Sequence, residues 1–269
     1  MKSSSKKPVN QSDHQAGVYP SRKKNGEIYY RASMTVRSKH ISLGSFDTAT
    51  EAHKAYLEGK RILENKSIDI LGYNKKYSLG YDKFISLLNF RDNGYYFATP
   101  IYMRQRLFYY CLTPKETLKF DLDDLFYYSS HRISKRGGHL FVADYGSQIS
   151  VRSRFGLMPY SVEGRDYRFR NGDNTDYRRE NLEIINTYNG VIFDPGSNKY
   201  LSRIHVKGYV TVGRYDSALE AAIAYNKAID MLSQKGSSKN YAPNYIDEVS
   251  PRVYADIYSV LTVSDYFSV

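Results

Sequence analysis

The chain has 269 residues, of which 41% are hydrophobic, so it is long enough to bury one large core or two to three small ones. Its 39 Lys and Arg residues outnumber its 28 Asp and Glu residues, and the formal net charge of +11 favours a polyanionic partner such as DNA, RNA or an anionic membrane. No apolar run approaches the roughly 18 residues that a membrane span needs, and the first residues lack the apolar segment of a secretion signal, so we expect a cytoplasmic protein.

The single cysteine, Cys111, excludes an internal disulfide and a cysteine-cluster zinc site, and its apolar neighbours predict a buried thiol. Residues 1–15 are rich in Ser and Lys, which predicts a disordered basic tail that adds weak electrostatic attraction to a polyanion.

Residues 16–74 form the first predicted domain. Within it, the side chains of YYRASMTVR, residues 29–37, alternate as in a strand that has one buried face. The residues expected to face the core are Tyr30, Ala32, Met34 and Val36. The residues expected on the outer face are Arg31, Ser33, Thr35 and Arg37, together with His40 and Ser42 after the next turn. Thr48 and Glu51 have capping-box spacing, so a helix is predicted to begin near Ala49 and to end before Asn65.

Residues 75–106 are predicted to form a linker with a helix around residues 81–90, and residues 107–186 form a middle domain. Its segment YRFRNGDNTDYRRENLEIIN, residues 167–186, contains a turn-rich NGDNTD and a helix-like RRENLEI. The arginines that we expect to contact phosphate are Arg165, Arg168, Arg170, Arg178 and Arg179. The alternative is an ordinary surface on which Asp166 and Glu180 balance this charge. Asp173, Asp176 and Glu180 would suit a metal, but we expect the aspartates to shape and cap a turn and Glu180 to be exposed.

Residues 187–247 repeat the first domain: SLGSFDTATEAHKAY, residues 42–56, aligns without a gap with TVGRYDSALEAAIAY, residues 211–225. A capping box at Ser217 and Glu220 predicts a helix from near Ala218 to near Gly236. The residues expected to face inward are Tyr200, Ser202, Ile204 and Val206. The residues expected to face outward are Arg203, His205, Lys207, Tyr209 and Thr211.

A solvated sheet face would have the same polar pattern, but its presence twice in a basic chain favours binding. Residues 248–269 form a C-terminal segment whose apolar spacing fits either a packed helix or a homodimer contact.

Each copy resembles the DNA-binding domain of the plant ethylene-response-factor (Apetala-two) family, which also occurs in bacterial and phage proteins. The resemblance covers residues 17–65 and 190–244, and rests on GVYPS and GVIFD, LGSFDTATEA and VGRYDSALEA, and the Ala-containing helix. It implies that a three-stranded antiparallel sheet enters the major groove while the helix packs behind it. The positions that it implies for base reading are Tyr19, Arg31, Ser33, Thr35, His40 and Ser42, and in the second copy Ile192, Arg203, His205, Tyr209 and Thr211. The plant family's sheet tryptophans and several of its arginines are absent, so no target sequence is carried over.

The middle segment resembles the core of HNH homing endonucleases, a family that often joins its nuclease to a C-terminal domain like the second copy. The residues that fit its spacing are Gly172, Asp173, Asp176, Arg178, Glu180, Asn181 and Leu182. The family's Asp-His pair falls on Arg168 and Phe169, and an Asn falls on Tyr177. That chemistry needs a His to activate water and a carboxylate to help hold a divalent metal, so we expect no catalytic residue, no metal and no cofactor.

The sequence therefore predicts an α+β protein in which two small domains, each a three-stranded antiparallel sheet plus a helix, flank a ββα-metal-like (HNH-type) middle domain. We expect it to bind double-stranded DNA sequence-specifically, as a cytoplasmic, nucleoid-associated transcriptional regulator of a bacterium or its mobile element, and not to be an enzyme. The alternatives are an active HNH-type nicking or homing endonuclease with atypical catalytic residues, and an RNA-binding or nucleoid-coating protein.

Overall fold

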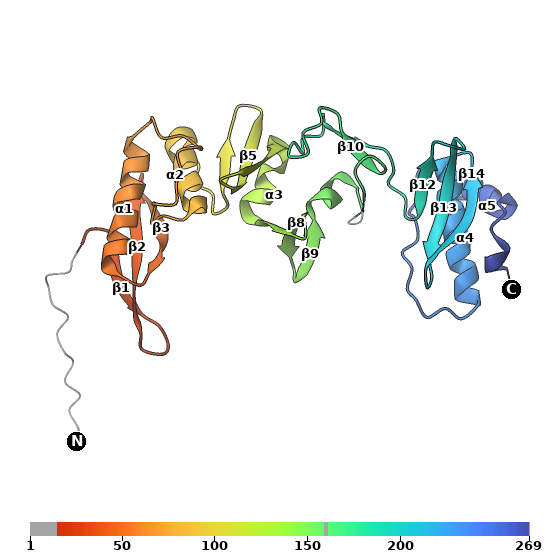
Figure 1. Ribbon diagram of the computed structural model, residues 1–269, viewed down its shortest axis with the longest axis horizontal. Helices are drawn as coiled ribbons and strands as arrows, with labels where there is room; N and C mark the ends of the chain where they lie inside the picture. The colour runs from red at the N-terminus through yellow and green to blue at the C-terminus, as the bar shows by residue number, and fades with distance from the viewer. Residues whose placement is uncertain (1–14, 159–160, 269) are drawn as a thin grey trace, which may run out of the picture. The chain divides into compact units, whose positions relative to one another are not determined.

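The computed structural model describes residues 15–158 and 161–268, so the predicted basic tail lies outside the described residues except for Gln15. The described chain is α+β, with several small three-stranded antiparallel sheets and five α-helices (Figure 1). It divides into two compact units: one holds the described residues up to 134 together with 175–178, and the other holds residues 135–174 and those from 179 onward. Within these described ranges, none of the helices has both the length and the apolar character needed to cross a membrane.

The first copy of the repeat folds as a sheet of β1 (Val18–Arg22), β2 (Ile28–Val36) and β3 (Lys39–Phe46), covered on one face by α1 (Ala49–Glu64). The predicted alternation of β2 is confirmed on the inner face, where Ala32 and Met34 are buried and Tyr30 and Val36 pack against the same core. The Thr48 hydroxyl accepts the amide of Glu51, 3.2 Å away, so α1 begins where the capping box predicted.

The second copy has the same order, β12 (Val191–Asp194), β13 (Lys199–His205) and β14 (Tyr209–Tyr215), followed by α4 (Ala218–Gln234). Ser217 and Glu220 form the complete capping box at the start of α4. On the inner face Ser202 and Ile204 are buried, as predicted. Both copies therefore place one helix on one face of a three-stranded sheet and leave the other face of the sheet without a helix of that copy (Figure 1).

Each sheet contains one β-bulge, at the same place in the repeat. The pairing register shifts between Ala32 and Ser33 in the first sheet and between Ser202 and Arg203 in the second. In both sheets the extra residue lies on the third strand, Leu43 in the first copy and Val212 in the second. One expected outer-face side chain is corrected beside the bulge: Ser33 is only 7% exposed and does not stand out from the outer face.

A glycine before the first strand holds each bulge in place. The carbonyl of Gly17 accepts a hydrogen bond from the amide of Ser33 at 2.9 Å, and the carbonyl of Gly190 accepts one from the amide of Arg203 at 2.8 Å. Both glycines have left-handed backbones, with φ of +77° and +70°. A Cβ added to either would overlap a helix tyrosine, Tyr56 for Gly17 and Tyr225 for Gly190. Because these glycines have no side chain, the sheet can pack closely against the helix tyrosine at this point.

Replacing Gly190 with alanine should destabilise the second unit by about 2 kcal/mol or more, since left-handed strain and overpacking add. Chemical denaturation would measure the change. Gly208→Ala is the matched control, because a Cβ there meets nothing within 4 Å and its backbone is not left-handed. Equal stability of the two variants would contradict this account of the contact.

An accessory helix packs against each repeat helix, and in both copies the same helix position anchors it. In the first copy Glu58 accepts the amides of Ser78 at 3.2 Å and Leu79 at 2.9 Å, just before α2 (Tyr81–Asn93) begins. Glu58 corresponds to Lys227 when the gapless alignment of the repeats is continued along the two helices.

In the second copy the Lys227 ammonium donates to the carbonyls of Tyr258 and Leu261, both at 2.8 Å, where α5 (Pro251–Val260) ends. A carboxylate thus binds free amides before a helix, and an ammonium binds free carbonyls at the end of one. The helix predicted around residues 81–90 is confirmed, and the C-terminal segment contains helix α5, which contacts α4 within the second unit. Its use as a homodimer contact stays a prediction.

Substituting Lys227 with Met should loosen α5 selectively, because two partly buried carbonyls lose their donor, an effect of about 1–3 kcal/mol. Hydrogen exchange should show faster exchange of the amides of residues 254–260, with β12–β14 unchanged. Lys207→Met, an exposed lysine in the same unit, is the control. Unchanged protection of α5 would rule out the anchoring role.

The middle of the chain contributes further short elements. In the first unit, β4 (Ile101–Met103), β5 (Leu107–Thr113) and β6 (Glu116–Asp121) form a sheet, followed by α3 (Leu125–Ser130). Cys111 lies in β5 with a fully buried side chain, as expected. After β7 (Ile133–Arg136), β8 (His139–Asp144) pairs with β9 (Ser147–Ser150), and β10 (Tyr167–Phe169) pairs with β11 (Leu182–Ile184).

The prediction of a helix at RRENLEI, residues 178–184, is wrong. Residues 179–181 form a turn, and Leu182–Ile184 is strand β11. The cause is Asn181, whose backbone carbonyl accepts the amide of Arg170 at 2.8 Å and whose side-chain oxygen accepts the amide of Asn171 at 2.9 Å. These bonds close a loop between the two strands, and local helix propensity does not compete with them.

Candidate nucleic-acid interface

The outer face of the first sheet is polar and open. Its exposed side chains are Tyr19, Arg31, Thr35, His40 and Ser42, as the sequence predicted. Between them lies a hollow lined by Tyr19, Arg31, Ala32, Ser33, His40 and Ser42. Ser33 is recessed at the bulge, so this face has a shallow depression beside its one central-strand guanidinium, that of Arg31.

Arg37, although exposed, is engaged within the first unit. Its guanidinium lies 5.3 Å from the centre of the Phe90 ring, and its Nη1 donates to the Phe90 carbonyl at 3.4 Å. Arg37 and Ser38 both have left-handed backbones and form the tight turn between β2 and β3. These contacts join the turn to α2, and they restrict the directions in which Arg37 can reach a ligand.

The outer face of the second sheet centres on Arg203 and Tyr209. The Arg203 guanidinium lies 4.2 Å from the centre of the Tyr209 ring, a close cation–π contact. His205 meets the same ring edge-on at 5.1 Å, and Lys239 donates to the His205 carbonyl at 2.6 Å. His205, Lys207, Tyr209 and Thr211 are exposed as expected, whereas Arg203 and Ile192 are half-buried. The Arg203 guanidinium is therefore preorganised by an aromatic surface.

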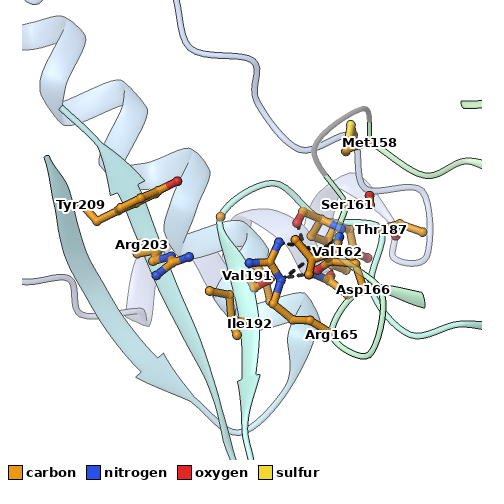
Figure 2. Close-up of a pocket in the computed structure, with 13 residues that line it drawn as sticks. Met158, Ser161, Val162, Arg165, Asp166, Thr187, Val191, Ile192, Arg203 and Tyr209 are labelled. Atoms are coloured by element: carbon orange, nitrogen blue, oxygen red, sulfur yellow. Dashed lines mark hydrogen bonds and ion pairs between the residues drawn. The ribbon is translucent and has the colours of Figure 1, made fainter. Parts of the chain in front are cut away.

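A loop of the middle segment extends this second face. Arg165 and Asp166 line a hollow that also contains Ile192, Arg203 and Tyr209 of the sheet, and Figure 2 shows these side chains around it. The loop and the sheet belong to the same compact unit.

Asp166 joins this loop to the sheet. The residue is only 4% exposed, and its carboxylate accepts the Val162 amide at 2.8 Å, Arg165 Nη2 at 2.6 Å and Asn186 Nδ2 at 3.2 Å. Asn186 Nδ2 also donates to the carbonyl of Val191 in β12, 2.6 Å away. Burial raises the pKa of Asp166, but the hydrogen bonds from Arg165, Val162 and Asn186 outweigh it and hold this pKa below its usual range.

The five arginines of the predicted basic cluster are not brought together as one group. Arg178 belongs to the first unit, where its guanidinium binds Asp176 at 2.6 Å. In the second unit Arg168 and Arg170 share Glu183, at 2.9 and 3.4 Å.

The hydrogen bond from Arg168 is the main cause that lowers the pKa of Glu183. Arg179 lies 5.8 Å from the centre of the Phe155 ring. Asp166, Asp176 and Glu183 thus balance much of this charge, which is the kind of ordinary surface that we weighed as the alternative.

Of the two aspartates in the NGDNTD segment, Asp176 shapes the turn through its carboxylate and Asp173 takes part through its backbone amide. Asp176 is fully buried and accepts both the amide and the guanidinium of Arg178, while Glu180 is exposed. Asp173 donates its amide to the Asn171 side chain at 2.8 Å. Within residues 15–158 and 161–268, no group of three or more His, Cys, Asp or Glu side chains is arranged to hold a metal ion.

Sequence reasoning missed Asn186 and Lys239, which position the second face. Asn186 is the last residue of the HNH-like match, where it carried no expected role, and Lys239 follows the second helix. Their partners, Val191 and His205, belong to strands of the second sheet. Composition and periodicity contain no signal for such contacts.

In comparisons with known proteins, no protein-family model matches the chain, and no curated protein or solved structure is detectably similar to it.

Asp166→Asn should lower the free energy of unfolding by about 2 kcal/mol at neutral pH, because the ionised form holds the loop together. The lowered pKa means that folding favours the ionised carboxylate. Its contribution is complete above the ordinary value of about 3.9 and is lost as the pH falls through the lower folded-state value. Unfolding curves at pH 7 and pH 3 should therefore show a smaller difference from wild type at pH 3. Asp256→Asn, an exposed site on α5, is the control, and a pH-independent difference would refute this assignment.

Proposed function

We propose that the protein binds double-stranded DNA sequence-specifically and uses the outer faces of its two bulged sheets as readers. The observation that carries this proposal is the duplicated sheet: two copies share helix cap, bulge and glycine contact, and both expose a polar face with an arginine on its central strand. A net charge of +11 supplies the long-range attraction to phosphate.

The faces have the chemistry that base recognition in the major groove requires. A guanidinium donates two hydrogen bonds to a guanine edge, and hydroxyl and imidazole groups bind either purines or pyrimidines. The first face offers Arg31, His40 and Thr35, and the second offers Arg203, His205 and Thr211. This agrees with the family resemblance, in which the sheet enters the groove and the helix packs behind it.

The other exposed basic residues are proposed to contact the DNA backbone, which sets position and not sequence. Arg165 is the best placed, because Asp166 fixes two of its nitrogens and leaves Nη1 without a bond to this carboxylate. Two readers on one chain also raise the affinity for a two-part site through effective concentration. This arrangement suits a transcriptional regulator.

We propose that the β10–β11 hairpin descends from an HNH core without retaining nuclease activity. At the positions of the family's Asp-His pair, Arg168 forms an ion pair with Glu183 and Phe169 is buried in the hairpin. A guanidinium does not bind a metal cation, and a phenyl ring does not accept a proton. The ββα-metal-like assignment is limited to these two strands, since the described residues 179–190 contain no helix.

Selection of bound duplexes from a randomised library, at moderate salt with magnesium, tests the proposal. Enrichment of a long two-part motif is the expected result. Binding without enrichment, or tighter binding to RNA, would replace it with a coating or RNA-binding function. Metal-dependent cleavage of the bound pool would instead reveal an active nuclease.

Arg165→Ala should weaken binding to every duplex by a similar factor and reduce the slope of log affinity against log salt by about 1. Fluorescence anisotropy from 50 to 300 mM salt would measure both. Arg252→Ala, an exposed arginine on α5, should leave the slope unchanged. An Arg165 variant with an unaltered slope would remove this residue from the interface.

A further inference from the structure

We infer that the two outer faces read different half-sites, because their central-strand guanidinium groups lie on opposite sides of the shared bulge. This inference rests on the proposed function and adds to it the residues that distinguish one reader from the other. It follows from the strand registers, which allow the two faces to be compared row by row.

In the row of paired residues before the bulge, the arginine lies on a different strand in each of the two sheets. In the first sheet, Arg31 of the central strand lies between Tyr19 and Ser45. In the second sheet the corresponding central residue is Leu201, between Ile192 and Arg214. Arg214 is on the outer strand, and its Nε is 3.8 Å from the carboxylate of Asp194. Only the first sheet therefore has a guanidinium at the centre of this row.

The row after the bulge has the opposite arrangement. Ser33 is paired with Ser42 in the first sheet, and Arg203 is paired with Thr211 in the second. One row further, Thr35 and His40 correspond to His205 and Tyr209. The gapless alignment of the repeat does not show this difference, because it begins after the central strand.

The side chains around each guanidinium fit this exchange. In the second sheet Arg203 rests on Tyr209, the residue that replaces His40. In the first sheet the place of Arg203 is taken by recessed Ser33, and the hollow between Arg31 and His40 remains open. The first face therefore has a depression after the bulge with its guanidinium on one side, whereas the second face has its guanidinium at that place, resting on a tyrosine ring.

The displacement has a predictable size on DNA. Two residues of a strand span roughly 7 Å, and successive base pairs are about 3.4 Å apart, so the two guanidinium groups differ by about two base-pair steps when the strand follows the groove. An arginine in this setting favours guanine. We therefore expect a non-palindromic site whose two halves each contain a guanine at a different position relative to the other contacted bases.

The test is selection from the randomised library with four variants beside the full-length wild type. Arg31→Leu should abolish the preference for guanine at one position of one half-site only. Arg203→Ser should abolish the preference for guanine at one position of the other half-site. The double variant Arg31→Leu with Ser33→Arg gives the first face the leucine and arginine of the second central strand, and should shift its preferred guanine by about two base pairs. Ser33 lines the hollow of the first face, into which the new side chain would extend. Arg252→Leu controls for the loss of a positive charge.

The outcomes separate this inference from the proposed function. Two identical half-sites in the wild-type motif, or loss of the same positions in both single variants, would overturn the inference while DNA reading by the sheets stands. Absence of any wild-type motif would overturn both. Circular dichroism and unfolding curves identify a misfolded variant. In that case the more conservative Arg31→Lys and Arg203→Lys replace it, because they keep the charge but not the two-point contact. They must weaken the preference for guanine at the same positions.

Discussion

One hydrogen bond in each repeat determines the geometry of its outer face. The amide of Ser33 donates to the carbonyl of Gly17 in the first copy, and the amide of Arg203 donates to the carbonyl of Gly190 in the second. Gly17 and Gly190 can make it because their left-handed backbones bring the chain against a helix tyrosine with no Cβ between them. The bond fixes the start of the first strand against the central strand, and it fixes the sheet against its helix. The side chain that follows the bulge is therefore set by the backbone: it is a recessed serine in one copy and an arginine in the other.

A second constraint comes from the accessory helices. Glu58 and Lys227 occupy one position of the repeat, yet bind free amides before α2 and free carbonyls at the end of α5, respectively. Each copy therefore covers its helix with a different segment while its sheet keeps the same form. The accessory helices pack against α1 and α4, whereas the residues of the outer faces come from the strands and the turns between them. This separation of scaffold from surface is what a pair of readers for different sequences requires.

Much of the fold follows from local patterns in the sequence. Capping residues predicted the starts of both repeat helices, and the two-residue period predicted the buried faces of the central strands, because these signals arise within a few residues. The failures have non-local causes. Ser33 is recessed beside a bulge whose extra residue, Leu43, lies on the neighbouring strand. RRENLEI forms a turn and a strand because Asn181 bonds across the hairpin to Asn171.

The candidate site was predictable to a similar extent. The exposed residues of the two faces were identified from alternation, but the pairing of Arg203 with Tyr209 and the anchoring of Arg165 by Asp166 depend on packing. The basic cluster was predicted from sequence proximity alone. The structure divides it between two units and pairs much of it with carboxylates, since arginines close in sequence need not share a surface.

The central claim is that both sheets read DNA from the major groove, and methylation interference tests it most directly. Guanine N7 lies in the major groove and adenine N3 in the minor groove, so methylation of each reports on one groove. On a duplex obtained by selection, N7 methylation should block binding at two separated groups of guanines, one for each sheet, whereas N3 methylation should have little effect. Binding that tolerates N7 methylation at every guanine would contradict the account.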